Sequence, residues 1–318
     1  YLKYRALKGE VEQVLSDKSY NSYQRFYIVF LIVLSIYGLL FLNNFSILSV
    51  LIRSGELKDN AEVTSSLATT IRYVSKFVPL FCCLYIFSMK NEPLWLKLIC
   101  FFGVFIVAFP IGNARFLVAA VYIPLVCVVF PSILNSMKGV YAILLSIVFV
   151  FPFLNQFRIL KDNIDVKFFP ELEFFLGGHF DSYQNFLRVF TEDFVTNGHQ
   201  LLGSMLFFIP RVFWESKPSG SGYLVASEFG YFFNNISMNF IGEGFINFGL
   251  IGVFVFVFVL STISSYFDFK YMALLKSGNF NPSSLFYLFG LGFLTFILRG
   301  DLLSASAFLF SGYFSFLV

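Results

Sequence analysis

The sequence predicts an all-α protein that crosses a membrane several times. Of its 318 residues, 58% are hydrophobic and 13% are charged, whereas soluble domains carry about 25% charged residues. Apolar stretches recur along the chain at close to the length of about 20 residues that a helix needs to cross a bilayer. We therefore predict a polytopic integral membrane protein with about eight transmembrane helices and one long loop outside the membrane that contains short amphipathic helices.

The apolar stretches give the expected spans in chain order. They lie at 26–43, 69–88, 94–109, 116–133, 138–154, 239–263, 283–298 and 301–318. No internal repeat is evident, which argues against a transporter built from paired halves. We expect residues 1–318 to form a single transmembrane domain. Because the chain begins at Tyr1 and ends at Val318 inside an apolar run, we also expect it to be a piece of a longer protein.

Lysine and arginine near the span ends predict the orientation, because cytoplasmic loops are enriched in these residues. Four places rich in them fall on one side of eight alternating spans, and we assign that side to the cytoplasm. The residues are Lys3, Arg5, Lys8, Lys18, Arg25, Lys90, Lys97, Lys138, Lys270 and Lys276. The opposite side then holds 44–68, 110–115, 155–238 and 299–301. Arg53, Lys58 and Arg72 are exceptions to the rule.

Several classes of protein are disfavoured by composition. The net charge of +3 is small, so we expect no nucleic-acid partner. All four cysteines fall inside expected spans, and the chain has two histidines, so neither a disulfide framework nor a metal site is expected. The sequence has no P-loop and no glycine-rich nucleotide fingerprint. We therefore expect no cofactor and no metal.

The segment 155–238 is the longest stretch between expected spans. It is rich in Phe, Leu and Tyr, so we expect it to be ordered. Residues 183–195 predict an amphipathic helix, whose apolar face consists of Phe186, Val189, Phe190 and Phe194. Residues 200–213 are apolar but too short to cross a bilayer, so they are expected to dip into it or lie flat, with Pro210 ending the helix.

Six cations fall on the side opposite the cytoplasm, at about one level in this topology. They are Arg115, Arg158, Arg188, Arg211, Lys217 and Arg299. Their neighbours are largely aromatic and solvate charge poorly, so this group predicts an anion site. The planar arginine fork suits it because it binds phosphate with two hydrogen bonds and stays protonated. The alternative is that each cation extends to the lipid headgroups from a span end.

Other candidates for chemistry lie on the same side. Asp181 and Tyr183 follow a glycine pair, and Asp181 is a candidate general base or a ligand for sugar hydroxyls. It is equally a candidate cap for a helix that begins at Ser182. His179 and His199 could accept a proton at physiological pH, or they could simply be solvated loop side chains.

Glu243 lies between two glycines in an apolar stretch, MNFIGEGFINFG. A carboxylate in such surroundings needs a partner, and we expect one of the arginines on the side opposite the cytoplasm. The two glycines could instead permit close helix packing. Lys76, one or two turns into the second expected span, is a further cation that could face the same site.

Two consecutive blocks carry a resemblance to a known family. IPRVFWESKPSGSGY at 209–223 and NISMNFIGEGFINFGLIG at 235–252 resemble the Wzy-type O-antigen and related oligosaccharide repeat-unit polymerases of bacteria. The shorter runs IGNARF, HFDSYQNF, NGHQLL and LRGDLL are similar to that family in kind and order. The resemblance covers residues 110 to 305.

The resemblance implies a metal-independent glycosyltransferase of the bacterial inner membrane, active at its periplasmic face, with 155–238 as one long periplasmic loop. The donor is a growing glycan on undecaprenyl diphosphate, and the acceptor is one repeat unit on the same lipid. Catalytic roles would go to Asp181, His199, Arg211 and Glu243. Binding of substrate and diphosphate would go to Arg115, Arg158, Tyr183, Arg188, Lys217 and Arg299. A chain-length regulator protein would be a further partner, besides the lipid bilayer.

Two other functions fit parts of the pattern. A ligase of the O-antigen type uses the same donor but transfers the glycan to lipid A core, and the IPR and KP residues favour the polymerase. A flippase for the lipid-linked unit would need polar groups through the whole membrane depth. In this sequence the charges concentrate toward one side, and the last three expected spans hold almost no ionisable group at mid-depth.

Overall fold

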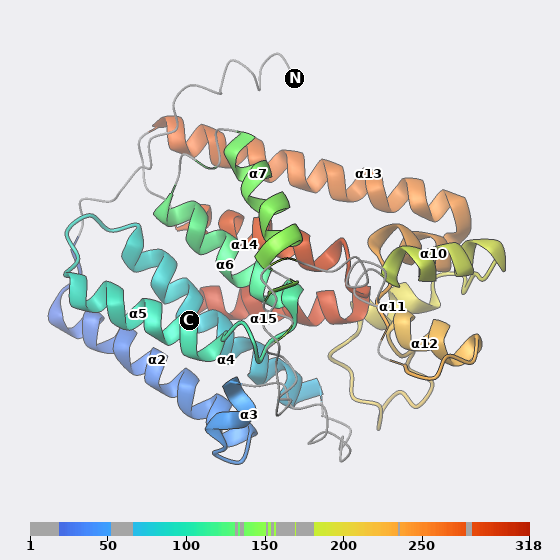
Figure 1. Cartoon of the computed structure of the whole chain (residues 1–318), viewed down its shortest axis with the longest axis horizontal. Helices are drawn as coiled ribbons and strands as arrows, with labels where there is room; N and C mark the ends of the chain where they lie inside the picture. Colours follow the sequence, from blue (N-terminus) through green and yellow to red (C-terminus); the bar gives the residue numbers. More distant parts are fainter. Residues whose placement is uncertain are drawn as a thin grey trace.

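The computed structural model shows a helical protein (Figure 1). It describes residues 19–51, 66–130, 133, 137–150, 152–153, 156, 169, 181–234, 236–277 and 282–318. Within these ranges the regular structure is helical, and it contains no β-strand. The all-α fold class is therefore confirmed for the described residues.

Three described helices are long and apolar enough to cross a membrane. They are α2 (Ser22–Leu42), the main part of α4 (Ser66–Phe87), and α13 (Phe240–Ser277). Shorter apolar helices are α5 (Leu94–Val107), α6 (Arg115–Val129), α7 (Met137–Leu145) with a π-helical turn at Ser146–Val150, α14 (Ser283–Ile297) and α15 (Leu302–Leu317). Each of the expected spans thus coincides with an apolar helix.

Local sequence signals mark where several of these helices begin. At the start of α2, the Asn21 side chain accepts a hydrogen bond from the Gln24 amide at 3.0 Å, and the Gln24 side chain bonds back to Asn21. At the start of α15, the Asp301 carboxylate accepts from the Ser304 amide at 2.7 Å. A short helix, α3 (Ile47–Leu51), follows α2.

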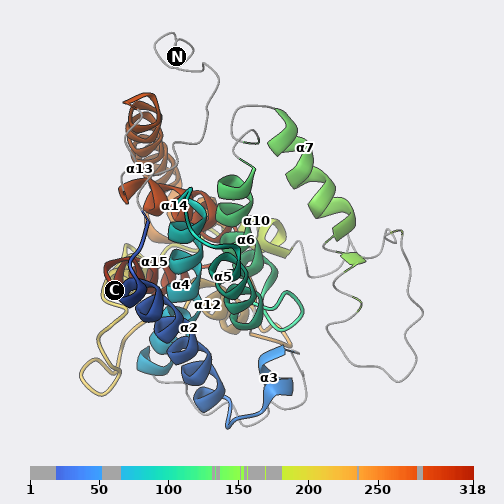
Figure 2. The same ribbon diagram turned by 90° about the vertical axis from the view of Figure 1, so that its left-hand side faces the viewer.

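The apolar helices pack around α4. Phe77 of α4 is fully buried, and its ring lies 5.2 Å from that of Phe289 in α14 and 4.5 Å from that of Phe308 in α15. Edge contacts of this kind stabilise aromatic cores beyond the area they bury. Helices α2, α5 and α6 complete the core around the same helix. Figure 2 shows α7 at the edge of this bundle.

Helices α6 and α14 approach each other at a glycine. A Cβ added at Gly292 would lie 2.1 Å from the carbonyl oxygen of Ala120, which is closer than real contacts allow. Gly290, two residues earlier in the same helix, has nothing within 4 Å of an added Cβ. The close backbone approach is typical of small residues between membrane helices.

We therefore expect Gly292→Ala to destabilise the protein by about 1–3 kcal/mol, because the added methyl group forces the two helices apart. Gly290→Ala is the matched control and should leave stability unchanged or raise it slightly, since alanine favours the helix. Thermal unfolding of the purified protein in detergent compares the two. Equal midpoints for both variants would contradict the packing.

Helix α13 is bent sharply near its start. Phe248 and Gly249 leave the helical conformation, and Gly249 adopts a φ of 63° that favours glycine. On either side of this corner Gly244 and Gly252 pack backbone to backbone, with an added Cβ at Gly252 only 2.0 Å from the Gly244 carbonyl oxygen. The expected span at 239–263 thus coincides with a long apolar helix whose first residues, 240–247, form a separate helical arm before the corner.

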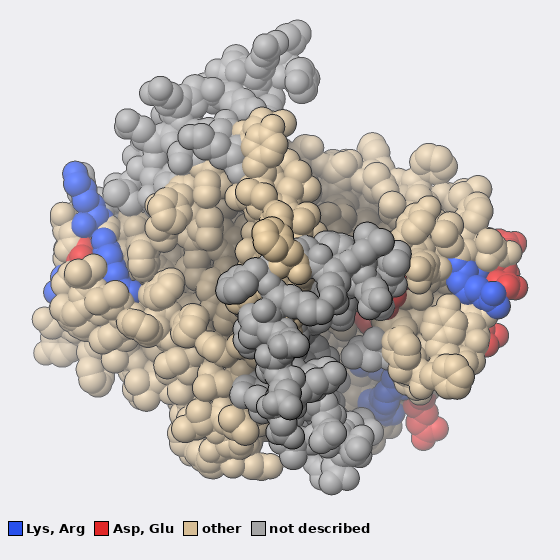
Figure 3. Space-filling view, in the orientation of Figure 1, with Lys and Arg blue, Asp and Glu red and all other residues tan. Residues whose placement is uncertain are grey.

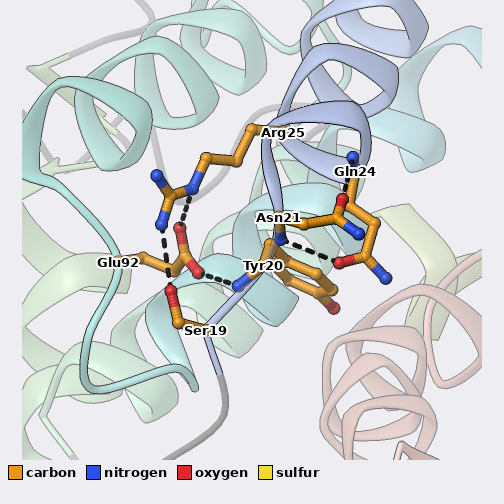
Figure 4. Close-up of polar contacts among 6 residues, drawn as sticks. All are labelled: Ser19, Tyr20, Asn21, Gln24, Arg25 and Glu92. Atoms are coloured by element: carbon orange, nitrogen blue, oxygen red, sulfur yellow. Dashed lines mark hydrogen bonds and ion pairs between the residues drawn. The ribbon is translucent and has the colours of Figure 1, made fainter.

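The helix ends lie at two opposite ends of the bundle. At one end, the Arg25 guanidinium at the start of α2 pairs with Glu92 before α5, with Nε and Oε2 2.9 Å apart (Figure 4). At the other end, Phe116 of α6 contacts Phe296 of α14, with ring centroids 4.7 Å apart. The 110–115 and 299–301 connections thus lie at the same end, opposite to Arg25.

Charged side chains follow the same division. On the face that Figure 3 shows, lysine, arginine, aspartate and glutamate gather toward two opposite ends of the molecule, and the described surface between them is uncharged. An uncharged belt between charged ends is typical of a helical bundle that lies in a bilayer.

The described part of the long segment forms a second, smaller core. It contains α10 (Asp181–Thr191), α11 (His199–Met205) and α12 (Ser221–Glu228). The amphipathic helix predicted at 183–195 is confirmed as α10 as far as Thr191, with Val189 fully buried. Phe194, which was expected on its apolar face, lies beyond the end of the helix, after Asp193 with a φ of 49°. This core comprises Val189, Val225, Ala226, Ile236, Met238, Phe245 and Ile246. The helical arm of α13 belongs to this core, which places the core at the 299–301 end of the bundle.

Candidate functional site

The polar side chains of the second core meet at the turn between α14 and α15. Four pieces of chain contribute: the start of α10, the residues 236–239 before α13, the start of α12 and the arm of α13. Most of the contacts described below join residues more than 40 positions apart in the sequence, so they depend on the tertiary fold.

The first contact zone fastens residues 237–239 to α10. The Asp181 carboxylate accepts a hydrogen bond from the Ser237 amide at 3.2 Å, and the Asn185 side chain donates to the Ser237 carbonyl at 2.8 Å. Asn239 donates to the Ser182 carbonyl at 3.1 Å and accepts from the Gly242 amide at 2.7 Å. Asn239 therefore caps the arm of α13 while holding it against α10.

Asp181 also faces the α14–α15 turn. Its Oδ1 lies 3.8 Å from Nη2 of Arg299. This oxygen is buried, and within the described residues no donor reaches it at hydrogen-bond distance. Burial lowers the pKa of the Arg299 guanidinium, and the Asp181 charge partly opposes that shift. Arginine nevertheless stays protonated, so this end of the bundle holds a fixed positive charge beside an incompletely satisfied carboxylate.

Glu243 is fully buried in the arm of α13. Its Oε2 accepts from the Ser221 hydroxyl at 2.8 Å, and its Oε1 accepts from the Leu302 amide at 2.8 Å. Ser221 and Leu302 are the first residues of α12 and α15, so the Glu243 side chain lies at two helix N-termini. Burial, and then the nearby charge of Asp301, nevertheless raise the pKa of Glu243 to about 8, although the hydrogen bonds from Leu302 and Ser221 oppose that shift. These donors take the place of the arginine partner that the sequence predicted.

Asp301 and Gly220 complete the junction of α12 with α15. A Cβ added at Gly220 would lie 2.4 Å from Oδ2 of Asp301, so the backbone before α12 runs directly over this carboxylate. Asn247, also fully buried, accepts from the Leu201 amide of α11 at 2.7 Å and donates to the Glu243 carbonyl at 2.8 Å. The arm of α13 therefore joins α10, α11, α12 and α15.

Arg211 and Lys217 lie together in the connection between α11 and α12. The Lys217 side chain is buried, and its ammonium donates to the Phe207 and Ile209 carbonyls. Burial, and to a smaller extent the charge of Arg211, lowers the pKa of Lys217. Arg211 is exposed and donates from Nη1 to the Lys217 carbonyl at 2.7 Å. Lys217 thus serves the folding of this connection, and Arg211 keeps further donors free to solvent.

Other predicted site residues lie at the rim of this region. Arg188 pairs with Glu192 one turn along α10, at 3.2 Å, and lies over the Phe229 ring at 5.0 Å. Tyr183 is 62% exposed, and His199 is exposed at the start of α11.

Two predicted arginines are described in part or not at all. The backbone of Arg115 begins α6, at the same end of the bundle as Arg299, and its side chain lies outside the described residues. Arg158 and His179 lie outside the described residues altogether.

Helix α4 adds polar groups at this end of the bundle, and the sequence had offered one of them, Lys76, as a further cation for the site. Lys76 is buried and donates to Asn113 in the connection before α6. Tyr73, one turn earlier, contacts the Phe308 ring, with centroids 5.7 Å apart. Its neighbour Arg72 had only counted as an exception to the orientation rule. Arg72 and Lys76 stand four residues apart on a predicted span, so they share one face of the helix, and this spacing could have indicated a polar face on α4.

The structure thus brings together Asp181, Glu243, Arg299 and Asp301. Within the described residues, Arg188 pairs with Glu192 instead, and Arg211 bonds to Lys217. In the same described residues no group of three or more His, Cys, Asp or Glu side chains could hold a metal ion.

Comparisons with known proteins leave the chain without an assigned relative. No protein-family model, no curated protein and no solved structure matches it.

Proposed function

We propose that this chain is a glycosyltransferase of the Wzy type, which polymerises oligosaccharide repeat units carried on undecaprenyl diphosphate. In this proposal the bundle lies in the bacterial inner membrane and the second core lies at its periplasmic face. The observation that carries the proposal is that the sequence blocks on which the family resemblance rests contact one another in the fold. DSYQN at 181–185, KPSGS at 217–221, SMN at 237–239, EGFIN at 243–247 and RGD at 299–301 bond or pack against one another.

The reaction needs fixed positive charge where the leaving group departs. The acceptor hydroxyl forms a new bond to the anomeric carbon of the donor sugar, and the bond from that carbon to the lipid diphosphate breaks. Negative charge develops on the departing phosphate oxygen, and preorganised donors in a site of low polarity stabilise it strongly. We assign this role to Arg299, with Arg211 as a second cation nearer to solvent.

The attacking hydroxyl needs a proton acceptor. We assign this role to Asp181, because its Oδ1 is buried without a hydrogen-bond donor among the described residues and lies beside Arg299. A carboxylate held by the Ser237 amide on its other oxygen is already oriented for this task. His199 and Tyr183, both exposed, are left to contact the sugars.

Glu243 takes a different role from the catalytic one that its sequence suggested. Because both carboxylate oxygens already accept hydrogen bonds and the residue has no exposed surface, it is best explained as a positioning residue. It holds α12 and α15 in register, and thereby holds Arg299 opposite Asp181.

The test is the lipopolysaccharide of a strain from which the gene is deleted. A polymerase-null strain should show core carrying a single repeat unit, with the ladder of longer chains restored by the wild-type gene. Complete absence of repeat units on the core would instead indicate a ligase or a flippase.

Arg211 gives a first prediction about the site. Arg211→Lys keeps the charge but loses the planar fork, so we expect a roughly tenfold lower polymerisation rate, corresponding to one lost charge-assisted hydrogen bond. Arg211→Ala should cost more. The measurement is the length of the polysaccharide in the deletion strain complemented at matched membrane levels. Wild-type lengths with Arg211→Ala would remove this residue from the site.

A further inference from the structure

Two acidic side chains meet at the first turn of α15, where the second core joins the bundle. Oε1 of Glu243 accepts a hydrogen bond from the Leu302 amide at 2.8 Å, and Oδ1 of Asp301 accepts one from the Ser304 amide at 2.7 Å. These amides stand two residues apart on one turn, along which the helix rises about 1.5 Å per residue. The two carboxyl groups are therefore neighbours.

The start of α12 contacts the same two carboxyl groups. The Ser221 hydroxyl donates to Oε2 of Glu243 at 2.8 Å. The backbone of Gly220 passes over Asp301, since an added Cβ would lie 2.4 Å from Oδ2 of that residue. Consecutive residues of one chain segment thus contact both acids, which places the pair between α12, the arm of α13 and α15.

No cation neutralises this pair at Glu243. Glu243 has no exposed surface, and within the described residues it forms no ion pair, so Asp301 is the charged group that acts on it. Arg299, at the end of α14, lies 3.8 Å from Asp181 of α10, and Lys217, before α12, donates to carbonyls of its own connection. The remaining ionisable side chains of α10, α11 and α12 are exposed, and they are Tyr183, Arg188, His199, Tyr223 and Glu228.

Two neighbouring carboxylates in such a place repel each other, so one of them stays protonated. The contacts of Glu243 accommodate the proton on Oε2. The Leu302 amide can only donate, so Oε1 must remain an acceptor, whereas the Ser221 hydroxyl can either donate or accept. A protonated Glu243 therefore keeps both hydrogen bonds, with its own hydroxyl donating to Ser221.

From this arrangement we infer that Glu243 and Asp301 form a carboxyl pair that holds one proton, that Glu243 carries this proton, and that its loss loosens the junction of the second core with the bundle. The pKa of Glu243, which burial and then the charge of Asp301 raise to about 8, agrees with this assignment. The inference depends on the fold and not on glycosyl transfer.

The proton gives stability a definite dependence on pH. The folded protein keeps it up to about pH 8, whereas the unfolded chain releases it near the ordinary glutamate pKa of 4.5. Stability therefore falls as the pH rises across this window and levels off above it. Glutamine at position 243 keeps the hydrogen bonds of the protonated acid but does not titrate, so Glu243→Gln lacks this component.

The test compares the wild type with three variants of the full chain, purified in detergent. Infrared difference spectra from about pH 5 to about pH 10 follow the carbonyl stretch of a protonated carboxylic acid, which ionised carboxylates lack. Glu243→Gln removes the proposed proton carrier, and Glu192→Gln is the matched control on an exposed carboxylate. Asp301→Asn removes the neighbouring charge but keeps the cap of α15. Thermal unfolding midpoints of the wild type and Glu243→Gln are recorded over the same pH range.

We expect the protonated band in the wild type and in Glu192→Gln, its absence from Glu243→Gln, and its loss as the pH rises through about 8. Asp301→Asn should move that loss to lower pH by about one pH unit or more. The unfolding midpoint of the wild type should fall relative to that of Glu243→Gln as the pH rises.

Identical bands in the wild type and Glu243→Gln would overturn the proton on Glu243. Loss of the band at an unchanged pH in Asp301→Asn would overturn the pair, because burial alone would then hold the proton. Midpoints of the wild type and Glu243→Gln that change in parallel with pH would overturn the role of the proton at the junction.

Discussion

Arg299→Lys is expected to lower the polymerisation rate roughly a hundredfold or more while the protein remains in the membrane at wild-type level. The guanidinium lies beside the buried Oδ1 of Asp181, and 32% of the arginine side chain is exposed, so it is the described cation best placed to meet both this oxygen and an incoming phosphate. Lysine keeps the charge but cannot form two parallel bonds to a phosphate. Removal of one donor of this type costs about 2.7–4 kcal/mol at the transition state.

Arg188→Lys is the matched control for this prediction. Arg188 is also an arginine of the second core, but its partner is Glu192 one turn away on the surface of α10. Exposed pairs of this type are worth about 1 kcal/mol or less, so chain lengths should stay at the wild-type value. Chain-length distributions in the deletion strain compare the two variants. If Arg299→Lys also gives wild-type lengths, Arg299 has no role in leaving-group departure.

Glu243→Leu is expected to destabilise the protein by about 3 kcal/mol or more. The change leaves the Ser221 hydroxyl and the Leu302 amide without their acceptor in a fully buried place, and each orphaned donor costs about 1–3 kcal/mol. Glu243→Gln should cost much less, since its carbonyl oxygen still accepts from Leu302 and its amide can donate to the Ser221 oxygen.

Thermal unfolding in detergent, followed by the monodisperse fraction that remains after heating, measures both variants. Activity should follow stability, with Glu243→Gln retaining polymerisation, because a positioning residue touches no substrate. A stable but inactive Glu243→Gln protein would contradict the structural role and restore Glu243 as a catalytic group. A Glu243→Leu protein as stable as the wild type would remove its role in joining α12 to α15.

The helices were predictable from the sequence because burial in lipid and burial in protein both demand apolar side chains. The apolar runs at 26–43, 94–109 and 283–298 correspond to α2, α5 and α14 within a few residues. Hydropathy carries no information on a corner inside an apolar run, and the break at Phe248 and Gly249 was therefore missed. The glycines around it had been noted only for close packing, which they do provide.

The composition of the candidate site was predictable in part. Asp181, Glu243 and Arg299 were expected on one side of the membrane, and they meet at one end of the bundle. Their individual partners were not predictable, since Glu243 binds a hydroxyl and an amide that become available only at the N-termini of α12 and α15. Likewise, nothing local to Lys217 indicates that its ammonium would serve carbonyls of its own connection.

The most direct measurement of the central claim is polymerisation by the purified protein. Membranes of the deletion strain should accumulate single repeat units on undecaprenyl diphosphate, and these can be extracted as substrate. Proteoliposomes that contain only this protein should convert them to a ladder of lipid-linked oligomers, without added nucleotide or divalent metal, and Arg299→Lys should slow that conversion roughly a hundredfold. Units that stay unchanged with the purified protein, while wild-type membranes elongate the same extract, would contradict the account.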